Sequence, residues 1–236
     1  NGASAKLTAD VSLGGYGVQI QYLAGTFDGN GHYITDIYGS SLFSYPNSGA
    51  VIRNLGVSGE VKGNGGIVEH HGLLSERTVG YTVENCVSRV DVTGSRAAGG
   101  IVGCADSGSL NSLPKVINCY NAGSVTGGYG YPGGVVGYNE SAPCTYIKNC
   151  YNVGNCNGYG VARAGRGTNS NNYTLLGSAP NAGGSAVQAA VLKTYADTLG
   201  DAYLDNPTSY NDGSFLKKRA LIGMQSMKSI VAKLII

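Results

Sequence analysis

The chain has 236 residues, of which 42% are hydrophobic, 13% are charged and 39 are glycine, with a formal net charge of +2. Glycine follows no G-X-Y period, which excludes collagen, and the apolar fraction favours a packed core over disorder. The sequence has no run of about 18 apolar residues, so we expect no membrane span. Residues 1–213 carry all 14 acids against 11 bases, so we expect no nucleic-acid partner.

Three short elements are expected before residue 50. Residues 16–22 (YGVQIQY) alternate in polarity as a strand does. Residues 27–37 (FDGNGHYITDI) combine a tight glycine–asparagine turn with a following strand. Leu42 and Phe43 form a short pair that we expect to point inward.

One pattern then recurs four times, at residues 52–63, 83–94, 116–127 and 147–158. Each copy has an asparagine at its third position, and these asparagines are 31, 33 and 31 residues apart. A short glycine-containing block, such as GGIVG, follows each copy. Self-similarity at a nearly constant period is typical of a repeat array. The anchoring asparagines are Asn54, Asn85, Asn118 and Asn149.

The apolar residues of each copy alternate up to the asparagine and then return one position too early for a straight strand. A bend at the asparagine restores the alternation, and asparagine tolerates the left-handed backbone conformation that such a corner needs. We expect its amide to bond to the backbone of neighbouring coils as a ladder. Two apolar columns result, namely Leu55, Cys86, Cys119 and Cys150, and then Val61, Val92, Val125 and Cys156.

These features predict an all-β fold, a single-stranded right-handed parallel β-helix, which is a solenoid with three short strands per coil. We assign residues 1–184 to this domain, with the clearest repeats at 52–160.

The remaining residues, 185–236, are expected to form a helical C-terminal cap. Residues 163–172 read as a loop, and Ser185–Leu199 have the apolar stripe and the N-cap of a helix. Residues 215–236 form a basic helical pattern. An end cap is the main interpretation of this tail, and contact with a membrane surface is the alternative.

The NCYNxGxVxG…GGxVG units resemble the GLUG-type repeat of bacterial cell-surface proteins. The segments LAGTFDGNGHYITDI and VIRNLGVSG are similar to the lead-in of such repeats, and the likeness covers about residues 23–160. It implies a β-helical part of a larger multidomain chain that is secreted or attached to a bacterial surface. Proteins of this kind include adhesins and some IgA-cleaving metalloproteases, but the HExxH signature of those proteases is missing here, so no peptidase site is carried over.

The four cysteines of the apolar columns are expected to be small buried hydrophobes, and no CxxC motif points to a metal site. Cys104 and Cys144 are expected in variable loops, where a disulfide between them stays open as an alternative. The run Glu69-His70-His71 has no third partner at a recognisable spacing. We therefore expect no metal and no cofactor.

Glu60 and Asp91 occupy equivalent positions on adjacent coils, which is the arrangement closest to the paired carboxylates of glycan-cleaving enzymes. The other acidic residues are scattered, so we assign no catalytic residue. Arg53 and Glu84 are expected to stack as opposite charges. His32 is expected to be bonded within its own turn.

Tyrosines are the main functional hint, because rigid aromatic faces with hydroxyl tips suit contacts to glycans and proteins. Tyr120 and Tyr151 are expected to project outward from equivalent positions, and Tyr129, Tyr131 and Tyr138 lie in nearby loops. Ladder stacking that only stabilises the sheet is the alternative for this set. The leading hypothesis is a non-catalytic, extracellular adhesion or display module that binds a glycan or a host or cell-surface protein. A carbohydrate-active β-helix enzyme and a purely structural stalk are the other two.

Overall fold

The computed structural model describes residues 3–69, 80–95, 98–104, 114–128, 130–137, 145–163, 167–181 and 183–187. The chain divides into two units, Asn1–Ala186 and Val187–Ile236. The fold described below is that of the first unit, because Val187 is the one described residue of the second. Over the described ranges the secondary structure is all β, and no helix there has the length and apolar character to cross a membrane.

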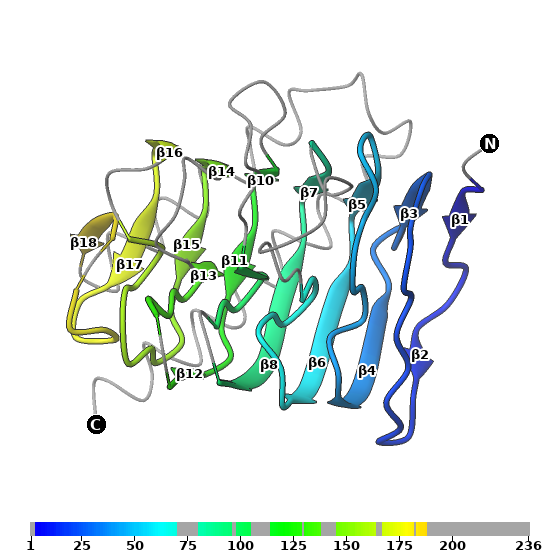
Figure 1. Ribbon diagram of the computed structural model, residues 1–236, viewed down its shortest axis with the longest axis horizontal. Coiled ribbons are helices and arrows are strands. Elements are labelled where there is room, and N and C mark those ends of the chain that lie inside the picture. Colours follow the sequence, from blue (N-terminus) through cyan, green and yellow to red (C-terminus); the bar gives the residue numbers. More distant parts are fainter. Residues whose placement is uncertain are drawn as a thin grey trace. The chain divides into compact units, whose positions relative to one another are not determined.

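Two large sheets carry most of the strands (Figure 1). Along both sheets the strands follow one another in chain order, and every pair with an assigned register is parallel. The first sheet contains, in spatial order, β1 (Ala5–Lys6), β3 (Thr26–Asp28), β5 (Val51–Arg53), β7 (Thr82–Glu84), β10 (Lys115–Ile117), β14 (Thr145–Lys148) and β16 (Gly167–Ser170).

The second sheet receives the chain directly after each corner. Its register runs, for example, from Val57 to Ser88 and from Asn121 to Asn152. It contains β2 (Val11–Ser12), β4 (Tyr33–Gly39), β6 (Gly56–Val61), β8 (Val87–Gly94), β11 (Tyr120–Asn121), β15 (Tyr151–Asn152), β17 (Tyr173–Leu175) and β18 (Ser185–Val187), and β12 (Val125–Gly127) also pairs with β8.

A third line of parallel contacts passes through the glycine-containing blocks. Its regular part is the pair β9 (Val102–Cys104) and β13 (Val136–Gly137). Single bridges extend it toward the N-terminus, from Val102 to Val68, from Val68 to Phe43 and from Phe43 to Ile20. The chain therefore passes through the first sheet, the second sheet and this third line in turn, and we call one such passage a coil.

Inward side chains from all three lines form one hydrophobic core. Both apolar columns expected from the repeat lie in it, with Leu55 and Cys86 fully buried and Val92 only 2% exposed. Leu42 and Phe43 are also buried, as expected. Burying a side chain the size of valine or leucine stabilises a fold by about 1.5–3 kcal/mol, so each member of these columns contributes to the stability of the core.

The corner asparagines form a continuous hydrogen-bonded ladder. Each of the four has φ between 53° and 56°, which is the left-handed conformation that the bend requires. The amides of Asn85, Asn118 and Asn149 donate to the side-chain oxygen of the preceding asparagine, for example Asn118 Nδ2 to Asn85 Oδ1 at 3.1 Å and Asn149 Nδ2 to Asn118 Oδ1 at 3.0 Å. The backbone acceptors expected from the sequence are thus replaced by side-chain acceptors in this ladder.

The ladder also extends beyond the four recognised copies. Asn54 Nδ2 donates to Asp28 Oδ1 across 26 residues, and Asn171 Nδ2 donates to Asn149 Oδ1 across 22 residues. Asn171 has a φ of 53° as well. Because these two steps are shorter than 31 residues, a search for a fixed period overlooks them.

A second, fully internal polar column lies beside the core. Asn121 and Asn152 are 0% exposed, and Asn121 Nδ2 donates to Asn152 Oδ1 at 2.8 Å. Glycines stand opposite because nothing larger fits: a Cβ on Gly134 would lie 2.3 Å from Asn152 Cγ and 2.2 Å from the Gly160 carbonyl oxygen. This packing gives a physical reason for the paired glycines of the GGIVG blocks.

Three expectations from the sequence are wrong among the described residues. The helix expected from Ser185 begins instead as strand β18, because the edge of β17 offers backbone partners, and Ser185 N–H donates to the Asn172 carbonyl at 2.9 Å. Within the stretch 163–172 read as a loop, β16 pairs with β14. Within the strand expected at 16–22, only Ile20 forms a bridge. The rest of the expected helical cap, including 215–236, lies outside the described residues.

Candidate functional site

Two columns of exposed side chains run side by side across the second sheet. A column here means residues at equivalent positions on successive strands, as set by registers such as Glu60 to Asp91 and Thr93 to Thr126. The two columns flank the buried column that starts at Val61. The first consists of Tyr38, Glu60, Asp91, Ser124 and Asn155, and the second of Lys62, Thr93, Thr126 and Asn157. We call these the outer columns.

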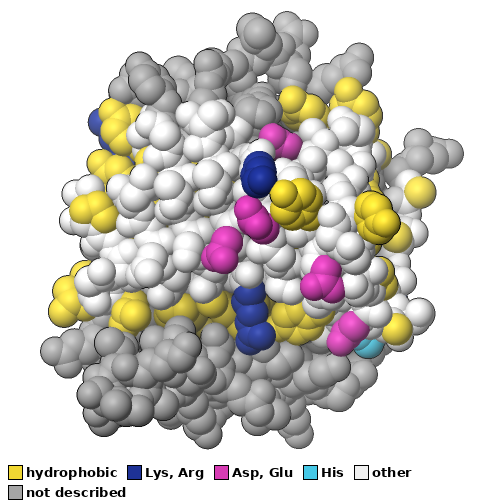
Figure 2. Space-filling model, turned by 90° about the horizontal axis from the view of Figure 1, so that it is seen from below, with side chains coloured by type: hydrophobic (Ala, Val, Ile, Leu, Met, Phe, Trp, Pro, Cys, Tyr) yellow, Lys and Arg dark blue, Asp and Glu magenta, His cyan; other side chains and the backbone are white. Residues whose placement is uncertain are grey.

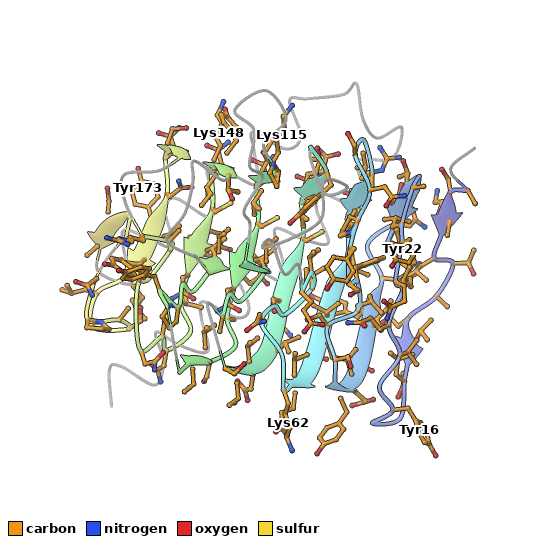
Figure 3. All side chains as sticks on the ribbon, viewed as in Figure 1. Tyr16, Tyr22, Lys62, Lys115, Lys148 and Tyr173 are labelled. Carbon is orange, nitrogen blue, oxygen red and sulfur yellow. The ribbon has the colours of Figure 1, made fainter. Side chains whose placement is uncertain are left out.

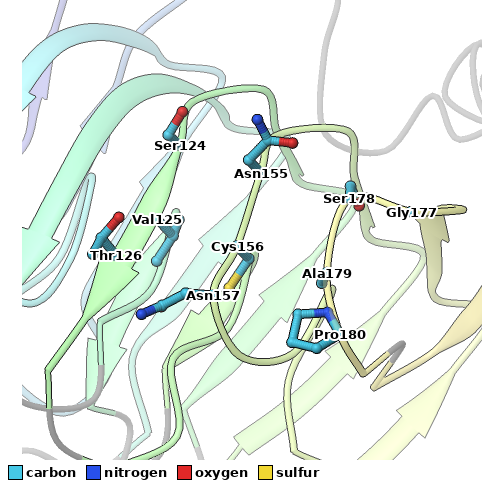
Figure 4. Close-up of a pocket in the computed structure, with 10 residues that line it drawn as sticks. All are labelled: Ser124, Val125, Thr126, Asn155, Cys156, Asn157, Gly177, Ser178, Ala179 and Pro180. Atoms are coloured by element: carbon cyan, nitrogen blue, oxygen red, sulfur yellow. The ribbon is translucent and has the colours of Figure 1, made fainter.

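The outer columns end in an open hollow of about 330 Å³ (Figure 4). Ser124, Thr126, Asn155 and Asn157 line one part of it, and the turn 177–180 lines the other. We call it the polar hollow. Figure 4 shows the side chains of the two columns standing on adjacent segments of the chain.

The polar groups of the hollow differ in how firmly they are held. Asn157 is fixed, because its amide donates to the Gly127 carbonyl at 2.9 Å and its oxygen accepts the Gly127 N–H at 3.0 Å. Within the described part of the chain, the hydroxyls of Ser124 and Thr126 and the amide of Asn155 make no hydrogen bond. These three groups offer donors and acceptors without net charge, which suits a ligand rich in hydroxyl groups.

The other end of the outer columns is charged. Lys62 Nζ donates to the Tyr38 hydroxyl at 3.0 Å, and this bond, followed by the nearby Glu60 carboxylate, raises the pKa of the lysine. Asp91 Oδ1 accepts the backbone N–H of Ser124 at 2.8 Å, which ties the charged end to the neutral one.

Charge is divided along the chain in the same way. Among the described residues, the seven acids all lie at or before Asp91, and the three charged residues after it, Lys115, Lys148 and Arg163, are basic. Figure 3 shows Lys115 and Lys148 projecting from neighbouring strands. On the face in Figure 2 the acidic side chains gather toward the centre and right, and the left part shows none.

Tyr120 and Tyr151 do not form the exposed aromatic face expected from the sequence. The residues that follow them in the chain, Asn121 and Asn152, face the interior. Because side chains alternate along a strand, the two tyrosine rings lie on the opposite side of the sheet, as expected. The rings are nevertheless only 6% and 5% exposed, and they stack with centroids 4.9 Å apart and planes 7° apart. Alternation predicts the side to which a ring points but not how much of the ring is exposed. The pair matches the alternative interpretation, in which the rings stack and stabilise the sheet.

The tyrosines expected in the nearby loops and the most exposed tyrosines lie in different places. Tyr131 is half-buried and lies edge-to-face with Tyr159 at 6.1 Å, whereas Tyr129 and Tyr138 lie outside the described residues. The most exposed described tyrosines, Tyr16 at 75% and Tyr22 at 64%, lie in the N-terminal coil (Figure 3). Sequence reasoning missed these two, although a tyrosine at each end of an alternating stretch was a signal for them.

The cysteine column is buried and hydrogen-bonded. Cys119 Sγ lies 3.2 Å from the Ile117 carbonyl oxygen and 3.6 Å from the Val83 carbonyl oxygen, either of which can accept its S–H, while Cys86 N–H donates to Cys119 Sγ at 3.4 Å. Burial raises the pKa of the Cys119 thiol well above its ordinary value. These contacts describe an unreactive structural position.

Cys156, at the floor of the polar hollow, is also a free buried thiol, and its pKa is raised by burial. Cys104 contributes its backbone to β9, which corrects its expected place in a loop. Its side chain lies outside the described residues, as does Cys144.

The remaining candidates are dispersed. Arg53 forms its ion pair with Asp28, Nη2 to Oδ2 at 3.0 Å, and is also the register partner of Glu84. His32 bonds to Asp10 at 3.0 Å, outside its own turn. Glu69 accepts a hydrogen bond from Gln19 Nε2 at 2.8 Å, and its neighbours His70 and His71 lie outside the described ranges. Across those ranges, His, Cys, Asp and Glu form no group of three that could hold a metal ion.

Comparison with known proteins adds little to this geometry. No protein-family model matches the chain, and no curated protein sequence does. A similar solved structure is that of a "putative immunoglobulin A1 protease" from Bacteroides ovatus, which is 19% identical with a TM-score of 0.49, over 81% of this chain and 79% of that one. Similarity at this level supports no conclusion about the fold or activity of this chain.

Proposed function

We propose that the described strands wind as a right-handed parallel β-helix of the GLUG-repeat type, in an extracellular, surface-attached or secreted bacterial protein of several domains. The asparagine ladder, with steps of 22 to 33 residues, supports this winding, since each step returns the chain to the next strand of the same sheet. Right-handed crossovers are strongly preferred between parallel strands.

On this scaffold the proposed function is non-catalytic binding of a glycan at the polar hollow. The observation that carries it is the uncharged end of the outer columns, where hydroxyl and amide groups stand at strand spacing, about 4.8 Å, beside an open hollow. Ser124, Thr126 and Asn155 take the role that the sequence analysis gave to Tyr120 and Tyr151. A sugar presents alternating hydroxyl donors and acceptors that such groups can match.

The test is a glycan array followed by calorimetry on the best binder. Thr126→Val is expected to weaken binding by about fivefold to tenfold, because it removes one hydroxyl and keeps the shape of the side chain. Thr93→Val is the matched control, since Thr93 is the register partner of Thr126 but lies outside the hollow. Equal binding by the wild type and Thr126→Val would exclude the hollow as the binding site.

A second candidate is glycan cleavage by the register partners Glu60 and Asp91. Adjacent strands place them about 4.8 Å apart at the Cα atoms, which is near the carboxyl separation of retaining glycosidases, about 5–5.5 Å. Release of new reducing ends by the wild type, abolished in both Glu60→Gln and Asp91→Asn, would favour this candidate. Silence in the array and in the cleavage assay would leave a structural stalk.

A further inference from the structure

Arg163 lies over an aromatic ring and, among the described residues, has no acidic partner. Its guanidinium carbon lies 3.8 Å from the centroid of the Tyr131 ring, and Tyr159 packs edge-to-face with Tyr131 at a centroid distance of 6.1 Å. Among the described residues, no carboxylate lies within ion-pair distance of Arg163 and no hydrogen bond involves its side chain.

Stacking uses the face of a guanidinium and leaves its edge available. The five N–H donors lie in the plane of the group, in a fork that matches a carboxylate with two parallel bonds. Because contact with the Tyr131 ring already restricts the Arg163 side chain, less side-chain entropy is lost when an anion binds. Arg163 is half-buried, so the interaction is screened less than that of a fully exposed lysine.

The surrounding charge favours an anion. No acidic residue follows Asp91 in the described part of the chain, and Lys115 and Lys148 add further positive charge there. An acidic ligand therefore meets no carboxylate among the described residues of these coils, whereas the earlier coils carry the described acids.

The position of the cluster links it to the polar hollow. Tyr159 follows Asn157, a lining residue of the hollow, by two positions, so their Cα atoms are at most about 7 Å apart. The guanidinium is connected to Tyr159 through the Tyr131 ring, so a ligand that contacts both the hollow and Arg163 has to be extended.

We propose that Arg163, stacked on Tyr131, binds the carboxylate of an acidic glycan whose hydroxyl groups lie in the polar hollow. This proposal rests on the glycan-binding function proposed above and names its ligand class. An acidic peptide also carries carboxylates, but the array of neutral hydroxyl and amide groups beside the arginine favours the sugar.

The experiment titrates oligogalacturonate into the whole chain by calorimetry, with its methyl-esterified form as the neutral match and poly-glutamate as the acidic peptide. Arg163→Gln is expected to weaken oligogalacturonate binding by about tenfold to a hundredfold and to leave the methyl ester unaffected. Arg163→Lys is expected to recover only part of the affinity, because an ammonium cannot form the fork. Lys148→Gln is the control for the loss of one positive charge, and circular dichroism checks that every variant is folded.

Each outcome decides the matter. Equal binding of oligogalacturonate by the wild type and Arg163→Gln, or no binding by the wild type, overturns the proposal. Poly-glutamate binding that matches oligogalacturonate and shares its dependence on Arg163 overturns the glycan assignment in favour of an acidic peptide. Binding of the methyl ester that depends on Thr126 but never on Arg163 overturns this inference and leaves the proposed function standing.

Discussion

The second sheet differs before and after Gly94. In the earlier coils β6 and β8 are unbroken strands of six and eight residues. In the next coil the same stretch is split into β11 and β12, and Ala122–Ser124 separate them. We call the two kinds the continuous coils and the interrupted coils.

The interruption has a local cause. The Asn121 side chain donates to the Gly123 carbonyl at 2.7 Å and accepts the Gly123 N–H at 3.2 Å, so it competes with the strand for these backbone groups. The continuous coils have Val57 and Ser88 at this position. The same repeat template thus carries a charged, unbroken surface in one region and an uncharged, hollowed one in the other.

The largest expected effect concerns the glycines that the interrupted coils need. Gly134→Ala should lower the free energy of unfolding by about 3 kcal/mol, because the new Cβ meets a carbonyl oxygen and Asn152, neither of which has room to move. Gly128→Ala is the control, since its Cβ would have no neighbour nearer than 3.5 Å. Urea denaturation measures both, and a similar small loss in the two variants would show that the internal packing is loose.

The next effect tests the buried polar column. Asn121→Ala leaves the Asn152 oxygen and the Gly123 backbone without their partner, which should cost about 2–3 kcal/mol of unfolding free energy. Asn155→Ala, on the exposed surface of the same coils, should change stability by less than about 0.5 kcal/mol. If both variants unfold at the same urea concentration, the column does not stabilise the interrupted coils.

The asparagine ladder is common to both regions, so its disruption should cost the same in each. Asn118→Ala combines left-handed strain with lost hydrogen bonds, for a total of about 2 kcal/mol, whereas Asn118→Gly keeps the conformation and should cost about 1 kcal/mol. The same pair of substitutions at Asn54 tests the continuous coils. Thermal unfolding in which alanine and glycine are equivalent would argue against strain at these corners.

The smallest expected effect is on pH dependence. Because burial raises the pKa of Cys119 above the ordinary value of 9.0, its contribution to stability is fully present below that pH and is lost as the pH rises and the unfolded thiol ionises. Between pH 8 and pH 10 the wild type should lose about 1 kcal/mol more than Cys119→Val, measured by urea denaturation with reductant present. Parallel losses in the two proteins would indicate that the thiol is not desolvated.

Much of the scaffold could be predicted from the sequence, and much of the surface could not. The left-handed corner at Asn118 and the burial of Val125 follow from residue type and alternation, which are local properties. The strand at Gly167–Ser170 was missed because its pairing partner lies 22 residues earlier in the chain, in β14, and its own composition resembles that of a loop.

Less of the candidate site than of the scaffold could be predicted from the sequence. The repeat spacing aligns Ser124 and Asn155 with Glu60 and Asp91, but it does not show that the turn 177–180 closes one side of a hollow there. The contact between Arg163 and Tyr131 joins residues from separate coils without any shared motif.

The sequence by itself determined the repeat, the corner residues and the apolar columns, since each depends on the conformational preference and polarity of single residues at a regular spacing. The tertiary structure alone decided that Tyr120 and Tyr151 are covered, that ladder asparagines bond to one another, and that uncharged groups gather around a hollow. The burial of the rings, the acceptors of the asparagine amides and the lining of the hollow all depend on which distant segments of the chain lie side by side. No local pattern contains that information.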